Sequence, residues 1–428
     1  MTAKNVGSRA SWVTCCKAKS ERKIEIEVQL ERHKEEETTM MKKLLAVAAF
    51  ATAATSPLLA AEGDAYVIGA SAAMTGSASS IYAPVIEAMK AYLDHVNSQG
   101  GINGRPVRLI VQDDGGEPSK AAANAKKLLS QDKVVLLMNT SLSSTYAPMV
   151  AEAQRAKVPL YFAGSVCPKD TYPPADPVQF CSTAFGATLD SQAALAFVKS
   201  STKEPVRLGL AAMAIPIARG EIDYAEGLSK TLGMNPVEKQ ITPPPTPDYT
   251  PFATKLKEAN PNWVYSWSPW VSQVRTFEAL RRLGWNGRYI TWAHLNAEDD
   301  LARVKDNEFY IIGTNALFQD NLPIQAEIRA VAHRAKISYP TTYLTEGYIA
   351  GMVIEGTLRN TPWPATPAKV LTAMNSLKVD LKGLRGGPLE WTKDNHFRTK
   401  QYYRVWHWDT PKSQIVRVQD WQAIEVKR

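Results

Sequence analysis

Residues 65–112 read AYVIGASAAMTGSASSIYAPVIEAMKAYLDHVNSQGGINGRPVRLIVQ. The apolar runs at the two ends of this stretch, 65–70 and 107–112, contain β-branched residues and predict strands. Between them, residues 84–97 carry apolar side chains at helical spacing, which predicts a helix. A short apolar strand, a helix and a second short strand form the repeating unit of a parallel sheet that helices cover on both faces.

The same alternation continues in two successive runs, separated by a Pro-rich stretch at 168–179. Two such runs predict an α/β fold of two lobes, each built on a doubly wound parallel sheet. The other predicted strands are 134–138, 158–162, 206–211, 237–241, 263–266 and 289–292, and the other predicted helices are 120–129, 149–156, 191–199, 223–232, 252–259 and 271–283.

The last part of the chain has a different pattern and is too short for a third domain of the same kind. Helical stretches at 324–337, 345–358 and 367–377 come first, and strand-like stretches at 402–408 and 415–421 follow. We expect this part to complete the two lobes and to cross between them, forming a multi-strand hinge. A binding protein that closes around a ligand requires such a hinge. The expected division is 62–187 for lobe 1, 188–312 for lobe 2, 313–384 for a return to lobe 1 and 385–428 for a return to lobe 2.

Composition indicates an ordinary globular chain. Of its 428 residues, 45% are apolar and 21% are charged, which excludes a collagen-like, coiled-coil or largely disordered protein. The net charge of +8 is small for this length. A nucleic-acid partner usually requires a concentrated basic face, so we expect none.

The N-terminal region has the pattern of an export signal. Residues 41–61 read MKKLLAVAAFATAATSPLLAA, in which two lysines precede a short apolar stretch and small residues follow. This three-part order predicts a signal peptide that is cleaved after Ala60 or Ala61, and hence a periplasmic protein. Because Met41 lies inside the chain, we hypothesise that translation begins there and that residues 1–40 are a gene-start artefact.

Two cysteines remain once residues 1–61 are removed. An even pair in an exported protein predicts a disulfide, here between Cys167 and Cys181. It would close a 15-residue loop and stabilise the fold by ~3 kcal/mol on the chain-entropy model. No His or further Cys lies within ligand spacing of the pair, so we expect neither a metal site nor a cofactor.

Several stretches, taken in order, resemble one family. The chain resembles the periplasmic solute-binding proteins of ABC importers with the type I fold, and within them the branched-chain amino acid (Leu/Ile/Val) binding family. The resemblance spans residues 64–428. It implies a monomer that captures a small molecule between its lobes and delivers it to an inner-membrane ABC permease. The stretches that carry it are IGASAAMTG (68–76), AYLDHVNSQGGINGRP (91–106), LIVQDDGGEP (109–118) and PTPDYTPFATKLKEANPNWVY (245–265).

The resemblance also implies binding residues in the first lobe. Tyr82, or Ile81 if one residue is inserted, corresponds to an aromatic wall of the pocket. Ser143 and Ser144 correspond to hydroxyls that bind a ligand carboxylate. Their position after a predicted strand agrees with this role, because ligands of open parallel sheets lie beyond the carboxyl ends of strands. Gly164 and Ser165, after the next strand, correspond to further contributors.

In the second lobe the resemblance implies aromatic contacts. Tyr224 corresponds to a tyrosine that closes over the ligand, and either Trp267 or Trp270 corresponds to another aromatic wall. For each of these aromatic residues, packing in the core is the alternative interpretation.

The ligand is where the chain departs from the family. Amino-acid binders pair the ligand ammonium with an acidic residue shortly after the strand that matches 289–292. Here no carboxylate follows until Glu298, Asp299 and Asp300, and these suit the first turn of a helix equally well. Near its strand ends the second lobe also carries an unusual density of tryptophan, which favours aromatic ligands: Trp263, Trp267, Trp270 and Trp292. We therefore expect a carboxylate-bearing ligand, either a hydrophobic amino acid or an aromatic acid.

Other functions have little support in the sequence. The histidines are scattered, and the chain contains no H-x-x-x-H pair, no G-x-S-x-G and no P-loop, so we expect no enzyme. The alternative that stays open is a binding protein that reports its ligand to a receptor rather than to a transporter.

Overall fold

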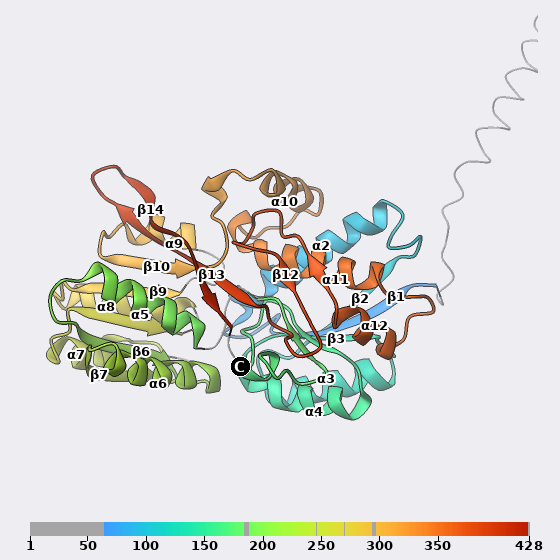
Figure 1. The fold of residues 1–428 in the computed structure, drawn as a ribbon, viewed down its shortest axis with the longest axis horizontal. Coiled ribbons are helices and arrows are strands. Elements are labelled where there is room, and N and C mark those ends of the chain that lie inside the picture. Colours follow the sequence, from blue (N-terminus) through green and yellow to red (C-terminus); the bar gives the residue numbers. More distant parts are fainter. Residues whose placement is uncertain (1–63, 184–187, 245, 269, 293–296, 427–428) are drawn as a thin grey trace, which may run out of the picture. The chain divides into compact units, whose positions relative to one another are not determined.

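The computed structural model describes residues 64–426 except 184–187, 245, 269 and 293–296 (Figure 1). The predictions for residues 1–40 and 41–61 lie outside the described residues. None of the described helices is long and apolar enough to cross a membrane.

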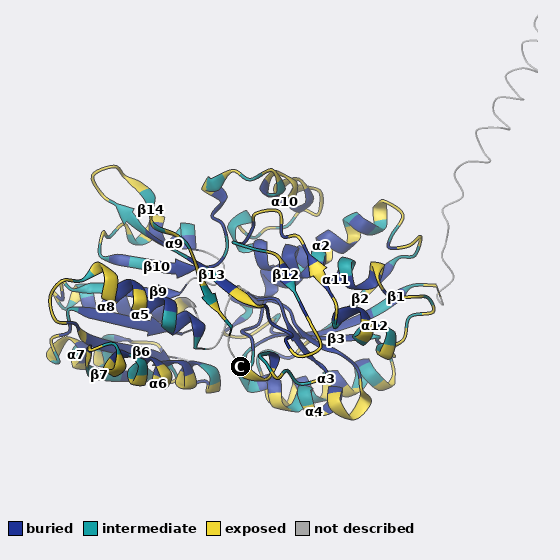
Figure 2. Cartoon of the chain, viewed as in Figure 1, coloured by how far each residue is buried: buried dark blue, intermediate teal, exposed yellow. Residues whose placement is uncertain are grey.

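The first sheet has five parallel strands in the order β2-β1-β3-β4-β5. Nearly all residues of β1, β3, β4 and β5 are buried, as expected for strands covered on both faces, whereas the edge strand β2 is mostly half-buried (Figure 2). The strands are β1 Tyr66–Ala72, β2 Val107–Asp113, β3 Leu136–Thr140, β4 Leu160–Phe162 and β5 Gln179–Cys181, and the connecting helices are α2 Ser79–Ser98, α3 Pro118–Ser130 and α4 Tyr146–Ala156. The sequence analysis missed β5, which is three residues long and ends the Pro-rich stretch.

The second sheet has seven strands in the order β14-β13-β10-β9-β8-β6-β7, and its five parallel strands confirm the second predicted α/β lobe. The strands β6 Arg207–Met213, β7 Asn235–Thr242, β8 Trp263–Trp267, β9 Arg288–Trp292 and β10 Phe309–Gly313 are parallel. The strands β13 Lys400–Asp409 and β14 Gln414–Glu425 pair antiparallel. A short turn joins β13 to β14, and two strands joined in this way can pair only as an antiparallel hairpin.

The helices of the second sheet are α5 Leu189–Ser201, α6 Pro216–Thr231, α7 Thr250–Glu258, α8 Trp270–Arg282 and α9 Ala297–Val304. Helix α6 begins seven residues before the predicted 223. Gly220 weakens the local helix signal, but Ala218 and Ile222 are fully buried, and this packing overrides the weak propensity. The early start matters because it places Ile217 at the first turn of α6.

The chain then returns to the first sheet through α10 Pro323–Arg334, α11 Thr345–Arg359 and α12 Pro367–Met374, with the small pair β11 Lys378–Val379 and β12 Leu389–Glu390. Helix α11 lies against α2 in the first core (Figure 1). The chain joins the second sheet only at Lys400, later than the expected 385. Leu389 and Trp391 are buried in the first core, where the indole N–H of Trp391 donates to the Cys181 carbonyl at 3.2 Å.

The predicted disulfide between Cys167 and Cys181 is present, and both residues are fully buried. It joins the segment after β4 to the end of β5. The Pro-rich stretch between them is thereby held against the first sheet.

Candidate functional site

Nine residues from both sheets line a small cavity that we call the aromatic chamber. It encloses ≈ 330 Å³ of empty space, part of it open to solvent. Its walls come from the start of α2, the segments after β3, β4 and β6, and the ends of β8 and β9. These are carboxyl ends of parallel strands, where open α/β sheets bind ligands. The lining residues are Ile81, Tyr82, Ser143, Tyr146, Val166, Ile215, Ile217, Trp267 and Trp292.

Two neutral tyrosines form the first-lobe wall. Tyr82 and Tyr146 are buried, and the hydroxyl of Tyr146 donates to the Val166 carbonyl at 2.8 Å. Burial, and to a smaller extent the Asp114 carboxylate, raise the pKa of Tyr82 far above its usual range. Burial does the same to the pKa of Tyr146. Both rings therefore offer uncharged aromatic surface to the chamber.

Two stacked indoles form the opposite wall. The rings of Trp267 and Trp292 lie 4.8 Å apart between centroids, at an interplanar angle of 23°. The indole N–H of Trp267 donates to Asp190 Oδ2 at 3.0 Å, and the Tyr403 hydroxyl donates to Asp190 Oδ1 at 2.6 Å. Asp190 thus ties the chamber wall to β13. With its N–H satisfied inside the protein, Trp267 contributes mainly apolar ring surface.

The chamber contains a buried hydroxyl, that of Ser143, without a partner among the described residues. A buried polar group without a partner costs about 1–3 kcal/mol, so native structures rarely keep one without a purpose. The Ser143 hydroxyl therefore keeps its hydrogen-bonding capacity free of the described residues.

A buried carboxylate, that of Asp114, holds the segment that carries Ser143 in place. Asp114 accepts hydrogen bonds from Ser71 Oγ at 2.7 Å, Ser141 Oγ at 2.6 Å and the Gly116 amide at 2.8 Å. Burial raises the pKa of Asp114. These bonds fix the turn that leads into the short 3₁₀ helix Ser143–Thr145, and so the position of the Ser143 hydroxyl.

Three other first-lobe candidates do not line the chamber. The Ser144 hydroxyl donates to the Gly116 carbonyl at 3.3 Å. Ser165 is fully buried, and its hydroxyl accepts from the Ser141 amide at 2.9 Å. Gly164 has a φ of 71°, and a Cβ there would lie 2.6 Å from Val85 Cγ1. These residues shape the loops around the chamber rather than its surface.

The second-lobe candidates also differ in whether they line the chamber. Trp267 lines the chamber, but Tyr224, with 36% of its surface exposed, does not. Because α6 begins at Pro216, the residues that reach the chamber are Ile215 and Ile217, and Tyr224 lies two turns further along. Trp270 is the first residue of α8, and its side chain lies outside the described residues.

Four lining residues were missed by the sequence analysis: Tyr146, Val166, Ile215 and Ile217. Ile215 and Ile217 follow β6 directly, so the rule that ligands lie beyond strand ends was the available signal for them. Tyr146 follows Ser143 by less than one helical turn, and only the direction of its side chain brings it to the chamber.

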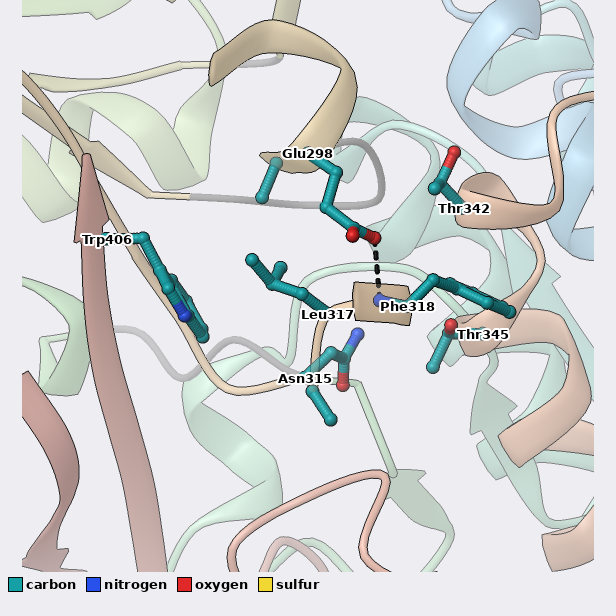
Figure 3. Close-up of a pocket in the computed structure, with 10 residues that line it drawn as sticks. Glu298, Asn315, Leu317, Phe318, Thr342, Thr345 and Trp406 are labelled. Carbon is teal, nitrogen blue, oxygen red and sulfur yellow. Dashed lines mark hydrogen bonds between the residues drawn. The ribbon is translucent and has the colours of Figure 1, made fainter. Parts of the chain in front are cut away.

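The acidic residues that were candidates for an ammonium partner lie elsewhere. Glu298 accepts hydrogen bonds from the amides of Phe318, at 2.6 Å, and Gln319, at 2.9 Å, in a separate pocket beside Trp406 (Figure 3). Asp299 accepts from the Thr342 hydroxyl at 2.5 Å. Asp300 pairs with Arg303 at 3.3 Å, and all three acids stand in the first turn of α9. The segment 293–296 lies outside the described residues. Among the described residues, no carboxylate lines the aromatic chamber.

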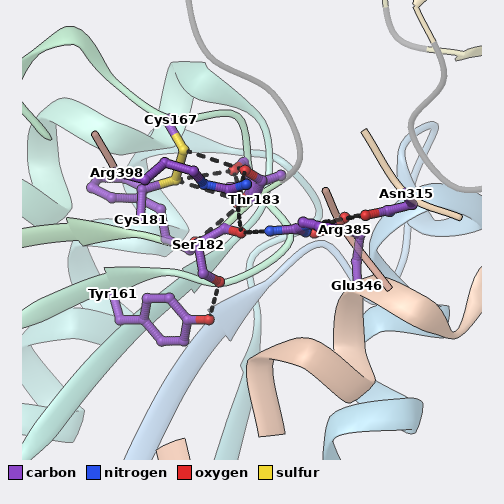
Figure 4. Close-up of polar contacts among 11 residues, drawn as sticks. Tyr161, Cys167, Cys181, Ser182, Thr183, Asn315, Glu346, Arg385 and Arg398 are labelled. Atoms are coloured by element: carbon purple, nitrogen blue, oxygen red, sulfur yellow. Dashed lines mark hydrogen bonds and ion pairs between the residues drawn. A yellow bond between two sulfur atoms is a disulfide. The ribbon is translucent and has the colours of Figure 1, made fainter. Parts of the chain in front are cut away.

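Segments that pass between the two sheets meet at a buried charged group, which we call the crossing cluster (Figure 4). Its members are Ser182, Thr183, Asn315, Glu346, Arg385 and Arg398. Arg385 and Glu346 pair at 2.5 Å with 1% of each side chain exposed. Arg385 also donates to Asn315 Oδ1 at 2.8 Å and to the Ser182 carbonyl. Arg398 donates to the carbonyls of Ser182 and Thr183. The described segments 182–183, 315 and 385–398 between the two sheets are therefore bonded to one cluster.

Comparison with known proteins agrees with this geometry. Residues 65–412 match the periplasmic binding protein family, and the chain therefore belongs to that family. It has the type I fold of ABC transporter substrate-binding proteins. Members of the family bind ligands, so the chain is a binding protein and not an enzyme.

One curated relative is an amino acid binding protein of Pseudomonas aeruginosa, 30% identical over 105 residues. This match covers 24% of the chain and only 28% of that relative's length.

Solved structures share the fold at low sequence identity. A branched-chain amino acid ABC transporter protein of Thermus thermophilus with bound valine superposes with a TM-score of 0.72 at 17% identity, covering 84% of this chain and 96% of that one. A solute-binding protein of R. palustris in complex with 4-hydroxybenzoate superposes with a TM-score of 0.70 at 15% identity, covering 85% and 98%. At these identities the likeness concerns the fold alone.

Proposed function

We propose that the chain is the periplasmic ligand-binding component of an ABC importer. As a monomer, it captures a carboxylate-bearing aromatic molecule between its lobes and delivers it to a permease in the inner membrane. The observation that carries the proposal is the aromatic chamber itself: stacked indoles and neutral tyrosines surround one buried hydroxyl that has no partner.

The walls favour a flat apolar ligand body. Trp267 and Trp292 line the cavity together with two tyrosines and four aliphatic residues, Ile81, Val166, Ile215 and Ile217. Aromatic pairs contribute about 0.5–1.5 kcal/mol beyond the burial of area. The Ser143 hydroxyl then donates to a carboxylate oxygen of the ligand, the role that the family resemblance implies for it.

The absence of an acid among the described lining residues disfavours an amino acid. A buried ammonium without a partner is strongly unfavourable. Glu298, the nearest candidate in sequence, already accepts two backbone amides. The relative from P. aeruginosa and the valine complex of T. thermophilus support the amino-acid alternative, and the 4-hydroxybenzoate complex supports the aromatic acid.

A thermal-shift panel on the purified protein tests the proposal. Benzoate- and cinnamate-type acids are compared with leucine, isoleucine, valine and phenylalanine. A ligand at about 100 times its Kd stabilises the folded protein by about 2.7 kcal/mol, and we expect this shift from aromatic acids and none from aliphatic amino acids. Stabilisation by aliphatic amino acids alone would contradict the proposed ligand class.

The variant Glu298→Gln provides a second arm of this test. Since the Glu298 carboxylate is engaged by Phe318 and Gln319, we expect the variant to bind aromatic acids as tightly as the wild type. Titration calorimetry measures this. Loss of binding to amino acids in this variant would instead identify Glu298 as the ammonium partner.

A further inference from the structure

A second cavity adjoins the aromatic chamber, and we call it the arginine chamber. It encloses ≈ 680 Å³ of empty space, part of it open to solvent, and the two cavities share Ile81. Leu142 lines the arginine chamber, and the next residue, Ser143, lines the aromatic chamber. The Ser143 hydroxyl is therefore one residue away from the junction between the two cavities.

The second-lobe side of this chamber carries one cation. Val271 and Arg275 are one turn apart on α8, so both side chains emerge on the same face of the helix, and both line the cavity. Across from them are Ser77, Ala78 and Leu142 of the first lobe. Among the described lining residues of the two chambers, no other side chain is charged.

Arg275 makes no hydrogen bond or ion pair with any described residue. Arg281, on the same helix, does have partners: it pairs with Asp306 at 2.8 Å and also donates to the Trp285 carbonyl. Arg275 is an exposed residue with no structural bond to hold it, and it lines a cavity that begins beside the unpartnered Ser143 hydroxyl of the aromatic chamber.

We propose that Arg275 is the counter-charge for the ligand's anionic group, and so selects net-negative ligands over zwitterions. The inference rests on the proposed function. The ligand ring occupies the aromatic chamber, and its carboxylate lies at the junction between Ser143 of lobe 1 and Arg275 of lobe 2. One hydroxyl supplies only one hydrogen bond to a carboxylate, whereas a guanidinium supplies charge and two parallel donors. Because the two groups come from different lobes, the ligand anion also favours closure.

The test compares an aromatic acid with its neutral amide. Affinities of a cinnamate-type acid and of the corresponding amide are measured by titration calorimetry for the wild type, Arg275→Gln and Arg275→Lys. We expect Arg275→Gln to weaken binding of the acid about tenfold and to leave the amide unchanged, because only the acid carries the charge that Arg275 pairs with. Arg275→Lys should restore part of the loss. The matched control is Lys255→Gln, which removes an exposed cation of α7 that lines neither chamber.

The outcomes separate this inference from the proposed function. Equal affinity of wild type and Arg275→Gln for the acid would overturn the role of Arg275 and leave the proposed function standing. Equal losses for acid and amide would also overturn it, because they would indicate lost packing rather than lost charge. A wild type that binds neither acid nor amide would contradict the proposed function, and the inference would fall with it.

Discussion

The aromatic chamber and the crossing cluster differ in the hydrogen-bond partners of their buried polar side chains. In the crossing cluster, Arg385 bonds to Glu346, Asn315 and Ser182, so a charge that is costly to bury is matched within the protein. In the aromatic chamber, Tyr146 and Trp267 donate hydrogen bonds to protein acceptors, whereas the Ser143 hydroxyl bonds to no described residue. The bonds of Arg385 indicate a structural role, whereas the Ser143 hydroxyl lines a cavity and stays open to a ligand.

The largest expected effect comes from breaking the crossing cluster. Replacement of Arg385 by Met leaves the Glu346 carboxylate buried without its cation, and we expect Arg385→Met to lower the free energy of unfolding by about 3–5 kcal/mol. Denaturant unfolding measures this. The double variant Arg385→Met with Glu346→Leu should recover much of the loss, because no unpaired charge is left. A single variant as stable as the wild type would show that the ion pair does not hold the crossings.

A third buried group, the Glu221 carboxylate, has hydrogen-bond donors but no cationic partner among the described residues. Glu221 on α6 accepts bonds from the Ser191 amide at 3.0 Å and the Ser191 hydroxyl at 2.5 Å, yet burial raises its pKa to about 7. Since the folded-state pKa lies above the ordinary 4.5, this group stabilises the fold most below about pH 4.5. That stability is lost as the pH rises through about 7.

We therefore expect Glu221→Gln to remove roughly 1–3 kcal/mol of pH dependence between pH 5 and pH 8, relative to the wild type. The difference between the two unfolding curves at each pH isolates this group from the other titrating residues. Parallel curves for wild type and variant would contradict the raised pKa.

The smallest of these effects falls on binding rather than on stability. We expect Ser143→Ala to weaken binding of an aromatic acid about tenfold, or about 1.4 kcal/mol, without lowering stability, because its hydroxyl bonds to no described residue. The adjacent Ser144→Ala is the matched control: its hydroxyl bonds to Gly116, and its removal should leave affinity unchanged. Calorimetry and thermal unfolding separate the two effects. The reverse result would assign the carboxylate to Ser144.

The sequence predicted the parts of the site that depend on local pattern. The resemblance named Tyr82, with Ile81 as its alternative, and either Trp267 or Trp270; Tyr82, Ile81 and Trp267 line the chamber, where each stands at the end of a strand or the start of the following helix. Ile215 and Ile217 were missed because α6 starts earlier than its own propensity indicates. Ser144 and Ser165 were also predicted to bind the ligand, but their hydroxyls bond within the loops. In a tight turn, neighbouring side chains point in different directions, so the sequence alone does not indicate which hydroxyl lines the cavity.

The alternation of short apolar strands and amphipathic helices, together with the single cysteine pair, was enough by itself to determine two α/β lobes and one disulfide. These features arise from periodicity within short segments, which the sequence displays directly. Only the tertiary structure decided that the second sheet ends in an antiparallel hairpin, that Arg385 pairs with Glu346, and that Glu298 turns to the amides of Phe318 and Gln319. Each of these depends on how segments far apart in the chain pack together, and the direction of a side chain in such contacts is set by its neighbours rather than by its own sequence.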